Sequence, residues 1–232
     1  AMSGKKRAAS NSSSLSPRPA TDSRRLRPIP SISPGFPLPE RALFAAFYAA
    51  NGVSLTPSEA EEILPAAFPF GRPDRNAMRR IARQHNRVMM AVKADESFLW
   101  EALGKNMPLL ILLPTGTTYR ATASPRIPVA WDRARGTLDL LDDSGDIQTL
   151  PDTEFFARRD PLKHAALILL HPGGVRQLHP TREQQLLLAD FWYEKGFYQR
   201  AAASYEAAGR SSSPGTDVDS LLGRGNVLVR QG

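Results

Sequence analysis

Residues 187–208 read LLADFWYEKGFYQRAAASYEAA, and this stretch decides how the C-terminal part of the chain folds. Apolar residues recur at helical spacing on both sides of Gly196, where a glycine favours a break between two helices. Small side chains at Ala189, Ala201 and Ala208 would let two antiparallel helices approach closely, and large side chains would fill the gaps between them. These large residues are Trp192, Tyr198 and Tyr205.

The spacing of these small and large residues resembles the tetratricopeptide repeat, a helical hairpin of about 34 residues. Residues 224–232, RGNVLVRQG, resemble the first helix of a second repeat. Because one hairpin cannot bury its own apolar face, we expect either a piece of a longer protein or a last helix that caps the first pair. The resemblance implies partner binding without catalysis, with Trp192, Tyr198 and Tyr205 as the expected partner-binding residues.

Residues 1–37 are rich in Ser, Pro and Arg and hold few side chains that could form a core, so they are predicted to be a disordered basic tether. The stretch from Ser31 to Pro39, which carries Ile32, Phe36 and Leu38 among prolines, is a candidate for an extended, ordered arm. The chain of 232 residues has a net charge of +7, and most of it lies before residue 32, where seven Lys and Arg residues accompany one Asp. The remainder is close to neutral, so we expect no nucleic-acid partner; a solvated linker is favoured over a tail that contacts phosphates.

Several site classes are excluded or disfavoured by composition. Cysteine is absent, which excludes disulfides, thiolate chemistry and cysteine-based metal sites. No apolar run approaches the roughly 20 residues that span a bilayer, so no transmembrane segment is expected, although a membrane tether in a longer protein stays open. The histidines match no metal-binding spacing, and the acidic residues near a predicted turn are typical of turn geometry, so no metal or cofactor is expected. The histidines are His85, His164, His171 and His179, and the acidic residues are Asp139, Asp142, Asp143 and Asp146.

The region between residues 38 and 172 begins with helices and continues with strands. Thr56, Pro57 and Glu59 form the sequence signature of a helix start with a capping box. Helices followed by antiparallel strands indicate an α+β domain over 38–172, followed by repeat helices over 180–232. The helices are expected at residues 39–51, 56–64, 74–85, 96–104 and 151–158, and the strands at 88–92, 109–113, 119–122, 127–132, 137–141, 147–150 and 165–170.

Four stretches of this region, in this order, resemble the papain-like cysteine peptidase domain that cleaves double-glycine leader peptides in bacteriocin export. The resemblance covers about residues 38–171 and implies helices packed on an antiparallel sheet. The stretches are ALFAAFYAANGVSLTPSEAEEIL (42–64), IARQHNRV (81–88), MPLLILLP (107–114) and VAWDRARGTLDLLDDSG (129–145).

The resemblance also implies where a catalytic site would lie. In that family a Cys nucleophile opens the first helix, a His base begins the hairpin, an Asp at its end orients the His, and an upstream Gln helps to hold the oxyanion. Here the Cys position falls at Pro39 or Glu40, the His position at or near Ser124, and only Asp142 matches, followed by Asp143 instead of Pro. No Gln stands just before the helix. Because a thiolate paired with an imidazole is what attacks an amide at neutral pH, we expect a pseudopeptidase.

The sequence therefore predicts a non-catalytic adaptor that binds a protein or peptide segment in a bacterial envelope or secretion assembly. The periplasm is the expected compartment, and the cytoplasm is the alternative. The rival functions are an active hydrolase or peptidase that uses non-standard residues, and a purely structural subunit of a large assembly. If Asp142 has no His to orient, replacing it by Ala is expected to leave folding and binding almost unchanged.

Overall fold

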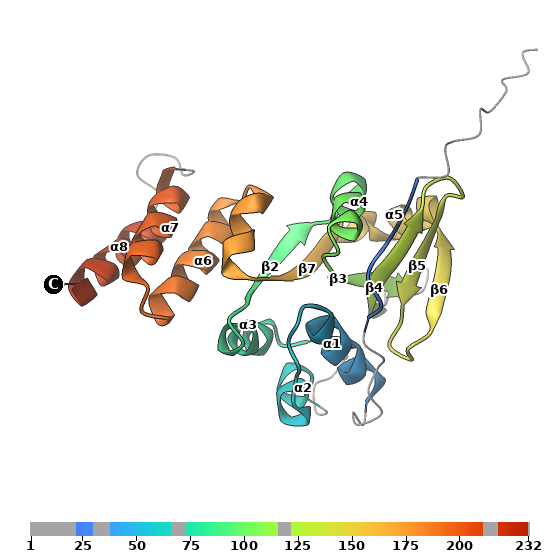
Figure 1. Cartoon of the computed structure of the whole chain (residues 1–232), viewed down its shortest axis with the longest axis horizontal. Helices are drawn as coiled ribbons and strands as arrows, with labels where there is room; N and C mark the ends of the chain where they lie inside the picture. The colour runs from blue at the N-terminus through green and yellow to red at the C-terminus, as the bar shows by residue number, and fades with distance from the viewer. Residues whose placement is uncertain (1–21, 30–37, 66–72, 116–121, 211–217, 232) are drawn as a thin grey trace, which may run out of the picture.

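The computed structural model describes residues 22–29, 38–65, 73–115, 122–210 and 218–231. Three helices begin the main body, a seven-stranded antiparallel sheet with two further helices follows, and three more helices extend from one end (Figure 1). The predicted α+β class and the C-terminal helices are confirmed. Of the arm proposed at residues 31–39, residues 31–37 lie outside the described residues, and Pro39 begins the first helix.

The first three helices are α1 (Pro39–Ala50), α2 (Pro57–Ile63) and α3 (Arg75–Gln84). The predicted capping box at the start of α2 is confirmed: the Glu59 amide donates to Thr56 Oγ1 at 3.2 Å, and the Thr56 amide donates to Glu59 Oε2 at 2.7 Å. The helix α1 lies deep in the core, where its large side chains are fully buried. These are Leu43, Phe44, Phe47 and Tyr48.

The sheet has the strand order β2-β7-β3-β4-β5-β6, and β1 pairs with β4 beside this path. All the pairs are antiparallel. The central strand β3 is the apolar run predicted from residues 109–113. The strands are β1 (Ser23–Arg25), β2 (Val88–Lys93), β3 (Leu109–Thr115), β4 (Thr122–Asp132), β5 (Thr137–Leu141), β6 (Ile147–Pro151) and β7 (Ala165–Leu170). The helix α4 (Glu96–Gly104) lies between β2 and β3 in the chain, and α5 (Asp152–Arg159) and the short 3-10 helix η1 (Asp160–Leu162) lie between β6 and β7. A second 3-10 helix, η2 (Pro172–Leu178), follows β7.

The longest strand, β4, begins at Thr122, earlier than the strand predicted over 127–132, so the break expected before Ile127 is wrong; the strand predicted over 119–122 lies outside the described residues except for Thr122. The first half of β4 pairs with β3, and its second half pairs with β5. The strand accommodates two prolines: Pro125 lies beyond the end of β5, where no described strand covers that edge of β4, and Pro128 borders a bulge. One continuous strand therefore joins the two halves of the sheet.

The predicted disordered tether is also wrong in part, because residues 22–29 are ordered on the body. Ser23 pairs with Asp132 and Arg25 with Ala130. The strand β1 therefore binds the same edge of β4 as β3 does, further along, where β3 no longer reaches. Leu26 is only 5% exposed, and its amide donates to the Val129 carbonyl at 2.9 Å. Composition predicts disorder here because the segment has few apolar residues. The segment is nevertheless held on the body, because its backbone pairs with the free edge of β4 and the Leu26 side chain is buried.

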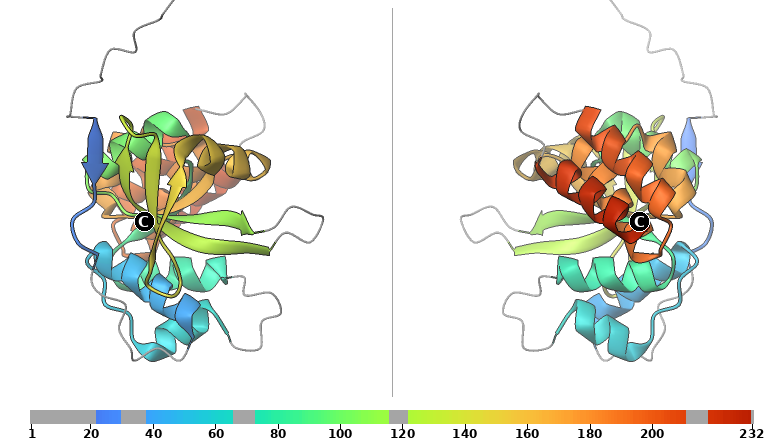
Figure 2. Two further views of the ribbon diagram at one scale, coloured as in Figure 1. Left: turned by 90° about the vertical axis from the view of Figure 1, so that its right-hand side faces the viewer. Right: turned by 90° about the vertical axis from the view of Figure 1, so that its left-hand side faces the viewer.

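The C-terminal helices are α6 (Arg182–Glu194), α7 (Tyr198–Arg210) and α8 (Val218–Gln231). The helix α6 joins them to the body, because Leu188 and Phe191 are buried in the main core. Gln184 Nε2 donates to the Ala91 carbonyl of the edge strand β2 at 2.7 Å. Of the helices predicted over 180–232, α6 thus shares the core of the body, while α7 and α8 pack on it through a second, smaller cluster around Ala201, Tyr205 and Val227. The helix α8 is the outermost of them (Figures 1 and 2).

Arg159 at the end of α5 is a fully buried cation that the sequence analysis did not single out. Its Nη1 donates to the Ala94 carbonyl at 3.0 Å, and its Nη2 donates to the His164 and Ala165 carbonyls at 2.8 and 2.9 Å. Burial lowers the pKa of Arg159 to about 10. The guanidinium therefore links α5 to the segments that flank β2 and β7.

Replacing Arg159 by Met should destabilise the protein strongly, because three carbonyls lose a charged donor that is itself fully buried. We expect the free energy of unfolding in urea to fall by about 3 kcal/mol. The matched control is Arg158→Met, whose partner is the surface residue Glu154, and it should cost at most about 0.5 kcal/mol. Equal losses for the two variants would contradict the role assigned to Arg159.

Candidate functional site

The segments that carry the predicted catalytic positions meet at one end of the sheet. The turn between β5 and β6 lies beside α1 in both Figure 1 and Figure 2. Pro39 and Glu40 form the start of α1, and Asp142 directly follows β5. Ser124 lies half-buried in β4, opposite Leu113 of β3. We call this end of the sheet the candidate cleft, because the resemblance implies a cleft here; the surface grooves found in the described residues lie elsewhere.

Asp142 has a structural task in this region. Its Oδ1 accepts hydrogen bonds from the backbone amides of Ser144 and Asp146, both at 2.9 Å. Such a carboxylate fixes the geometry of a turn. We therefore expect the removal of Asp142 to affect folding, in place of the earlier expectation of almost no change, because this oxygen accepts two hydrogen bonds within the β5–β6 turn.

The residue that faces the acidic turn from β4 is Arg126, which the sequence analysis missed. Ile127 pairs with Leu141, so Arg126 comes next to the turn, and its Nη1 lies 3.3 Å from Asp143 Oδ1. The sequence analysis placed the histidine position at Ser124 by counting residues back from Trp131. Such a count does not reveal which residues of β4 and β5 pair, and a bulge shifts that pairing here. The available signal was that Arg126 is the one charged residue between positions 123 and 131.

The chemistry of Arg126 differs from that of a catalytic histidine. A guanidinium carries only donors and stays protonated in proteins, so it cannot accept a proton from a nucleophile. Its Nη1 also donates to the Pro125 carbonyl at 2.8 Å, while its Nε is buried and has no hydrogen-bond partner among the described residues. The Arg126–Asp143 pair can hold a carbonyl or carboxylate group of a ligand, but it cannot generate a nucleophile.

Two pairs of an imidazole and a carboxylate occur elsewhere in the described residues. His85 Nε2 lies 2.8 Å from Glu59 Oε1, and His164 Nε2 lies 2.8 Å from Asp160 Oδ1. Thr56 Oγ1 donates to Glu59 at 2.9 Å, so the carboxylate stands between the hydroxyl and the imidazole. In a Ser-His-Asp relay the imidazole must stand in the middle. The His85–Glu59 pair instead ties α3 to α2.

Hydrogen bonding outweighs burial at Glu59. Burial alone would raise the pKa of this carboxyl, but hydrogen bonds from the Thr56 backbone, from His85 and from the Thr56 hydroxyl lower it below its usual range. The ionised form is therefore favoured in the folded protein.

The partner-binding residues predicted on the repeat helices differ in accessibility. Tyr205 is 6% exposed, and its hydroxyl donates to Asp190 Oδ1 at 2.7 Å. A Cβ on Gly223 would lie 2.3 Å from its ring, so Tyr205 packs α6, α7 and α8 together. The prediction that Tyr205 binds a partner is therefore wrong.

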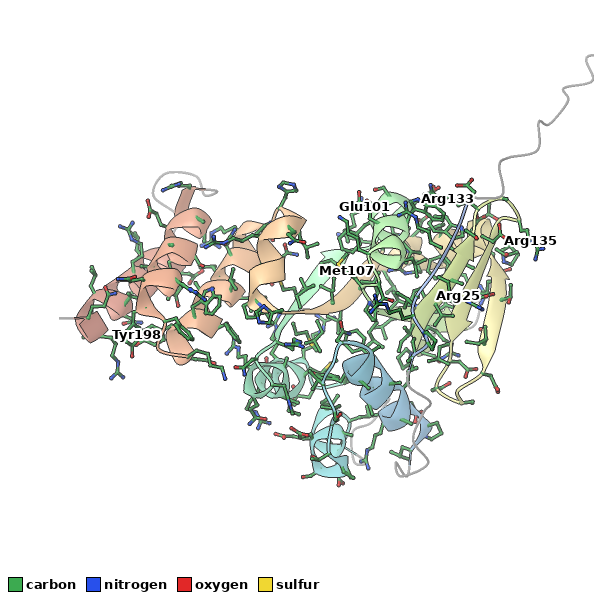
Figure 3. The ribbon with its side chains drawn as sticks, in the orientation of Figure 1. Arg25, Glu101, Met107, Arg133, Arg135 and Tyr198 are labelled. Carbon is green, nitrogen blue, oxygen red and sulfur yellow. The ribbon has the colours of Figure 1, made fainter. Side chains whose placement is uncertain are left out.

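Trp192 and Tyr198 are half-buried and remain predictions as partner-binding residues. The Trp192 ring packs edge-on against Phe197 with centroids 5.6 Å apart, and Tyr198 packs against Tyr193 at 5.7 Å. Figure 3 shows Tyr198 on the C-terminal helices, far from the end of the sheet that carries the candidate cleft.

Two surface grooves lie away from the candidate cleft. One separates α3 from α6 and is crossed by the Arg83–Glu194 ion pair, and the other lies between β1 and α4. Neither is lined by Pro39, Glu40, Ser124 or Asp142. Within the described residues, no group of three or more acidic or histidine side chains is placed to hold a metal ion. No helix in that part of the chain is both long and apolar enough for a bilayer.

Comparisons with known proteins give a likeness to solved structures only. No protein-family model matches the chain, and no curated protein matches it. A similar solved structure is the peptidase domain of Streptococcus ComA, a bifunctional ABC transporter involved in a quorum-sensing pathway. It is 13% identical in sequence, the match covers 63% of this chain and 96% of that domain, and the TM-score is 0.43. The likeness is one of backbone arrangement.

Replacing Asp142 by Ala should loosen the β5–β6 turn, because two backbone amides lose their acceptor. We expect the free energy of unfolding to fall by about 1–2 kcal/mol. Asp146→Ala is the matched control, since it keeps the amide that Asp142 binds, and it should change stability by less than about 0.5 kcal/mol. A neutral Asp142→Ala would show that the turn closes without this carboxylate.

Replacing Glu59 by Gln should reduce stability at neutral pH and have less effect in acid. Because the folded pKa of Glu59 is lowered, its contribution is present above its unfolded pKa, about 4.3, and is lost as the pH falls through the folded pKa. Urea unfolding of both proteins between about pH 6 and pH 3 measures the difference. A difference that stays constant over this range would contradict the assignment.

Proposed function

We propose that this chain is a non-catalytic adaptor whose body, similar to a papain-like peptidase domain, binds an extended peptide or protein segment. The C-terminal helices form a second platform for a protein partner. Its proposed setting is an envelope or secretion assembly of a bacterium, with the periplasm as the proposed compartment. The alternative is an active hydrolase or peptidase that uses non-standard residues.

One observation carries the non-catalytic part of the proposal, namely the Arg126–Asp143 pair. In the relatives that the sequence resembles, an imidazole and a carboxylate occupy this end of the hairpin. Here the base would be a guanidinium, which stays protonated, and the chain has no cysteine to activate. Recognition without cleavage is what such a site supports.

The shape of β4 supports binding of an extended segment. Residues 123–126 pair with β3 on one edge, while β5 ends opposite Ile127, so no described strand covers their other edge. An open edge can accept a peptide as an additional strand. The docking of β1 on residues 130–132 is an example of such an addition from within the chain. Arg126 at this edge would bind a carbonyl or the terminal carboxylate of the peptide.

The C-terminal helices are held firmly against the body, which suits a platform of fixed orientation. Arg83 of α3 forms an ion pair with Glu194 of α6, and Gln184 binds β2. Leu188 and Phe191 extend the same core into α6. A partner on these helices would therefore be placed at a defined angle to the candidate cleft.

The test uses fluorescently labelled leader-like peptides that end in Gly-Gly, once with a free carboxylate and once with a terminal amide. We expect the free acid to bind in the micromolar range and Arg126→Glu to weaken it at least about tenfold. Arg135→Glu is the matched control, because Arg135 lies at the outer end of the β4–β5 hairpin (Figure 3). Anisotropy measures binding, and mass spectrometry of the recovered peptide measures cleavage.

Two results would overturn the proposal. A peptide cut at one defined bond by the wild-type chain, and left intact by Arg126→Glu, would make the protein an enzyme. Equal loss of binding in Arg126→Glu and Arg135→Glu would remove the candidate cleft as the binding site. Unfolding curves of both variants show that a loss of binding is not a loss of fold.

A further inference from the structure

The groove between α3 and α6 carries more positive than negative charge. It has a volume of about 540 Å³, within the usual range of ligand-binding pockets, and it lies where the C-terminal helices meet the body (Figure 1). Three cations line it from α3, and two carboxylates and one cation line it from α6 and its C-terminal end. This excess favours an anionic ligand. The cations are Arg79, Arg80, Arg83 and Lys195, and the carboxylates are those of Asp190 and Glu194.

Two of the four cations have no carboxylate partner. Arg83 is paired with Glu194 across the groove, and Arg80 is paired with a glutamate of α2. Within the part of the chain that the structure describes, neither Arg79 nor Lys195 takes part in an ion pair. They stand on opposite walls, because Arg79 is a half-buried residue of α3 and Lys195 is the exposed residue that ends α6. A carboxylate of a ligand could therefore be bound from either wall.

The two carboxylates in the groove decide between the classes of anionic ligand. Glu194 binds Arg83, and Asp190 Oδ1 accepts the Tyr205 hydroxyl at 2.7 Å, so both stay in place on the α6 wall. A nucleic acid carries a charge on every phosphate and would bring some of them against this wall. A peptide can place carboxylates on the cations and turn backbone amides, which are donors, toward Asp190 and Glu194. The pattern of charge thus favours an acidic peptide.

The length of the groove indicates how much of a peptide it holds. Its lining runs from Asn76 to Arg83 on α3 and from Leu187 to Glu194 on α6, which is seven residues, or about 10 Å, along each helix. An extended peptide spans this length with about three or four residues. Leu187 is the one large apolar residue among the lining side chains, so it offers a contact to an apolar residue of the ligand.

We infer that the groove between α3 and α6 binds a short acidic peptide segment of a partner protein, with Arg79 and Lys195 as the residues that hold its carboxylates. This inference rests on the second platform of the proposed function, and it names the site of that platform and the chemistry of its partner. The groove shares no lining residue with the candidate cleft. Because its charges lie at the surface, the binding is weakened by salt.

The test uses the intact chain and a fluorescently labelled peptide, Gly-Glu-Glu-Leu-Glu-Glu-Gly, whose terminal amide keeps a free carboxylate from the candidate cleft. We expect fluorescence anisotropy at about 100 mM salt to give a dissociation constant of about 10–100 μM, and at least about tenfold weaker binding at about 500 mM salt. The same peptide with Gln in place of every Glu should bind at least about tenfold more weakly, because it has no carboxylate for the two cations.

Matched variants locate the site. Arg79→Gln and Lys195→Gln should each weaken binding of the acidic peptide about fivefold or more, since each removes one charge from the groove. Arg75→Gln is the control, because Arg75 lies on the same helix and does not line the groove, and it should change binding less than about twofold. Arg126→Glu should also leave this binding unchanged. Lys195 is exposed, so its variant keeps the test valid if Arg79→Gln loses stability in urea.

Three outcomes would overturn the inference. The first is a wild-type chain that does not bind the acidic peptide at concentrations up to about 1 mM. The second is an equal loss in Arg79→Gln and Arg75→Gln, which would show general attraction to a basic surface. The third is an oligothymidine of about ten nucleotides that binds more tightly than the peptide and is lost in the same variants, which would make the groove a nucleic-acid site. The Gly-Gly peptide and Arg126→Glu report on the candidate cleft separately, so a failure at one site is not mistaken for a failure at the other.

Discussion

The pairing of β4 along its whole length is the constraint on which the rest of the structure depends. This strand of 11 residues bonds β3 with one half and β5 with the other, and β1 continues the edge that β3 leaves. A bulge between Pro128 and Ala130 shifts the register within this strand, and the pairing with β5 continues on both sides of the bulge. The strand therefore fixes both the sheet and the hairpin whose end forms the candidate cleft.

The same pairing determines the chemistry of the candidate cleft. Because the register brings Arg126 beside Asp143, a permanently protonated guanidinium lies next to the acidic turn. Asp142 accepts hydrogen bonds from backbone amides of its own turn and so holds the loop in shape. We propose on this basis that the site recognises a peptide and leaves its bonds intact.

Much of the fold could be predicted from local signals. The capping box at Thr56, the cap at Asp74, the apolar run of β3 and the glycine at position 196 each act within a few residues, so sequence periodicity and capping rules detect them. The errors arise from long-range pairing: the docking of residues 23–25 on β4, the register that selects Arg126, and the burial of Tyr205 under Gly223. None of these contacts leaves a trace in local composition.

The most direct measurement of the central claim is amide hydrogen exchange of the intact chain with and without a Gly-Gly peptide, followed by recovery of the peptide. Our account predicts slower exchange at residues 123–126 and 142–146, while β2 and α8 stay unchanged and the peptide returns at its full mass. Unchanged exchange at both segments, or a shortened peptide, would contradict it.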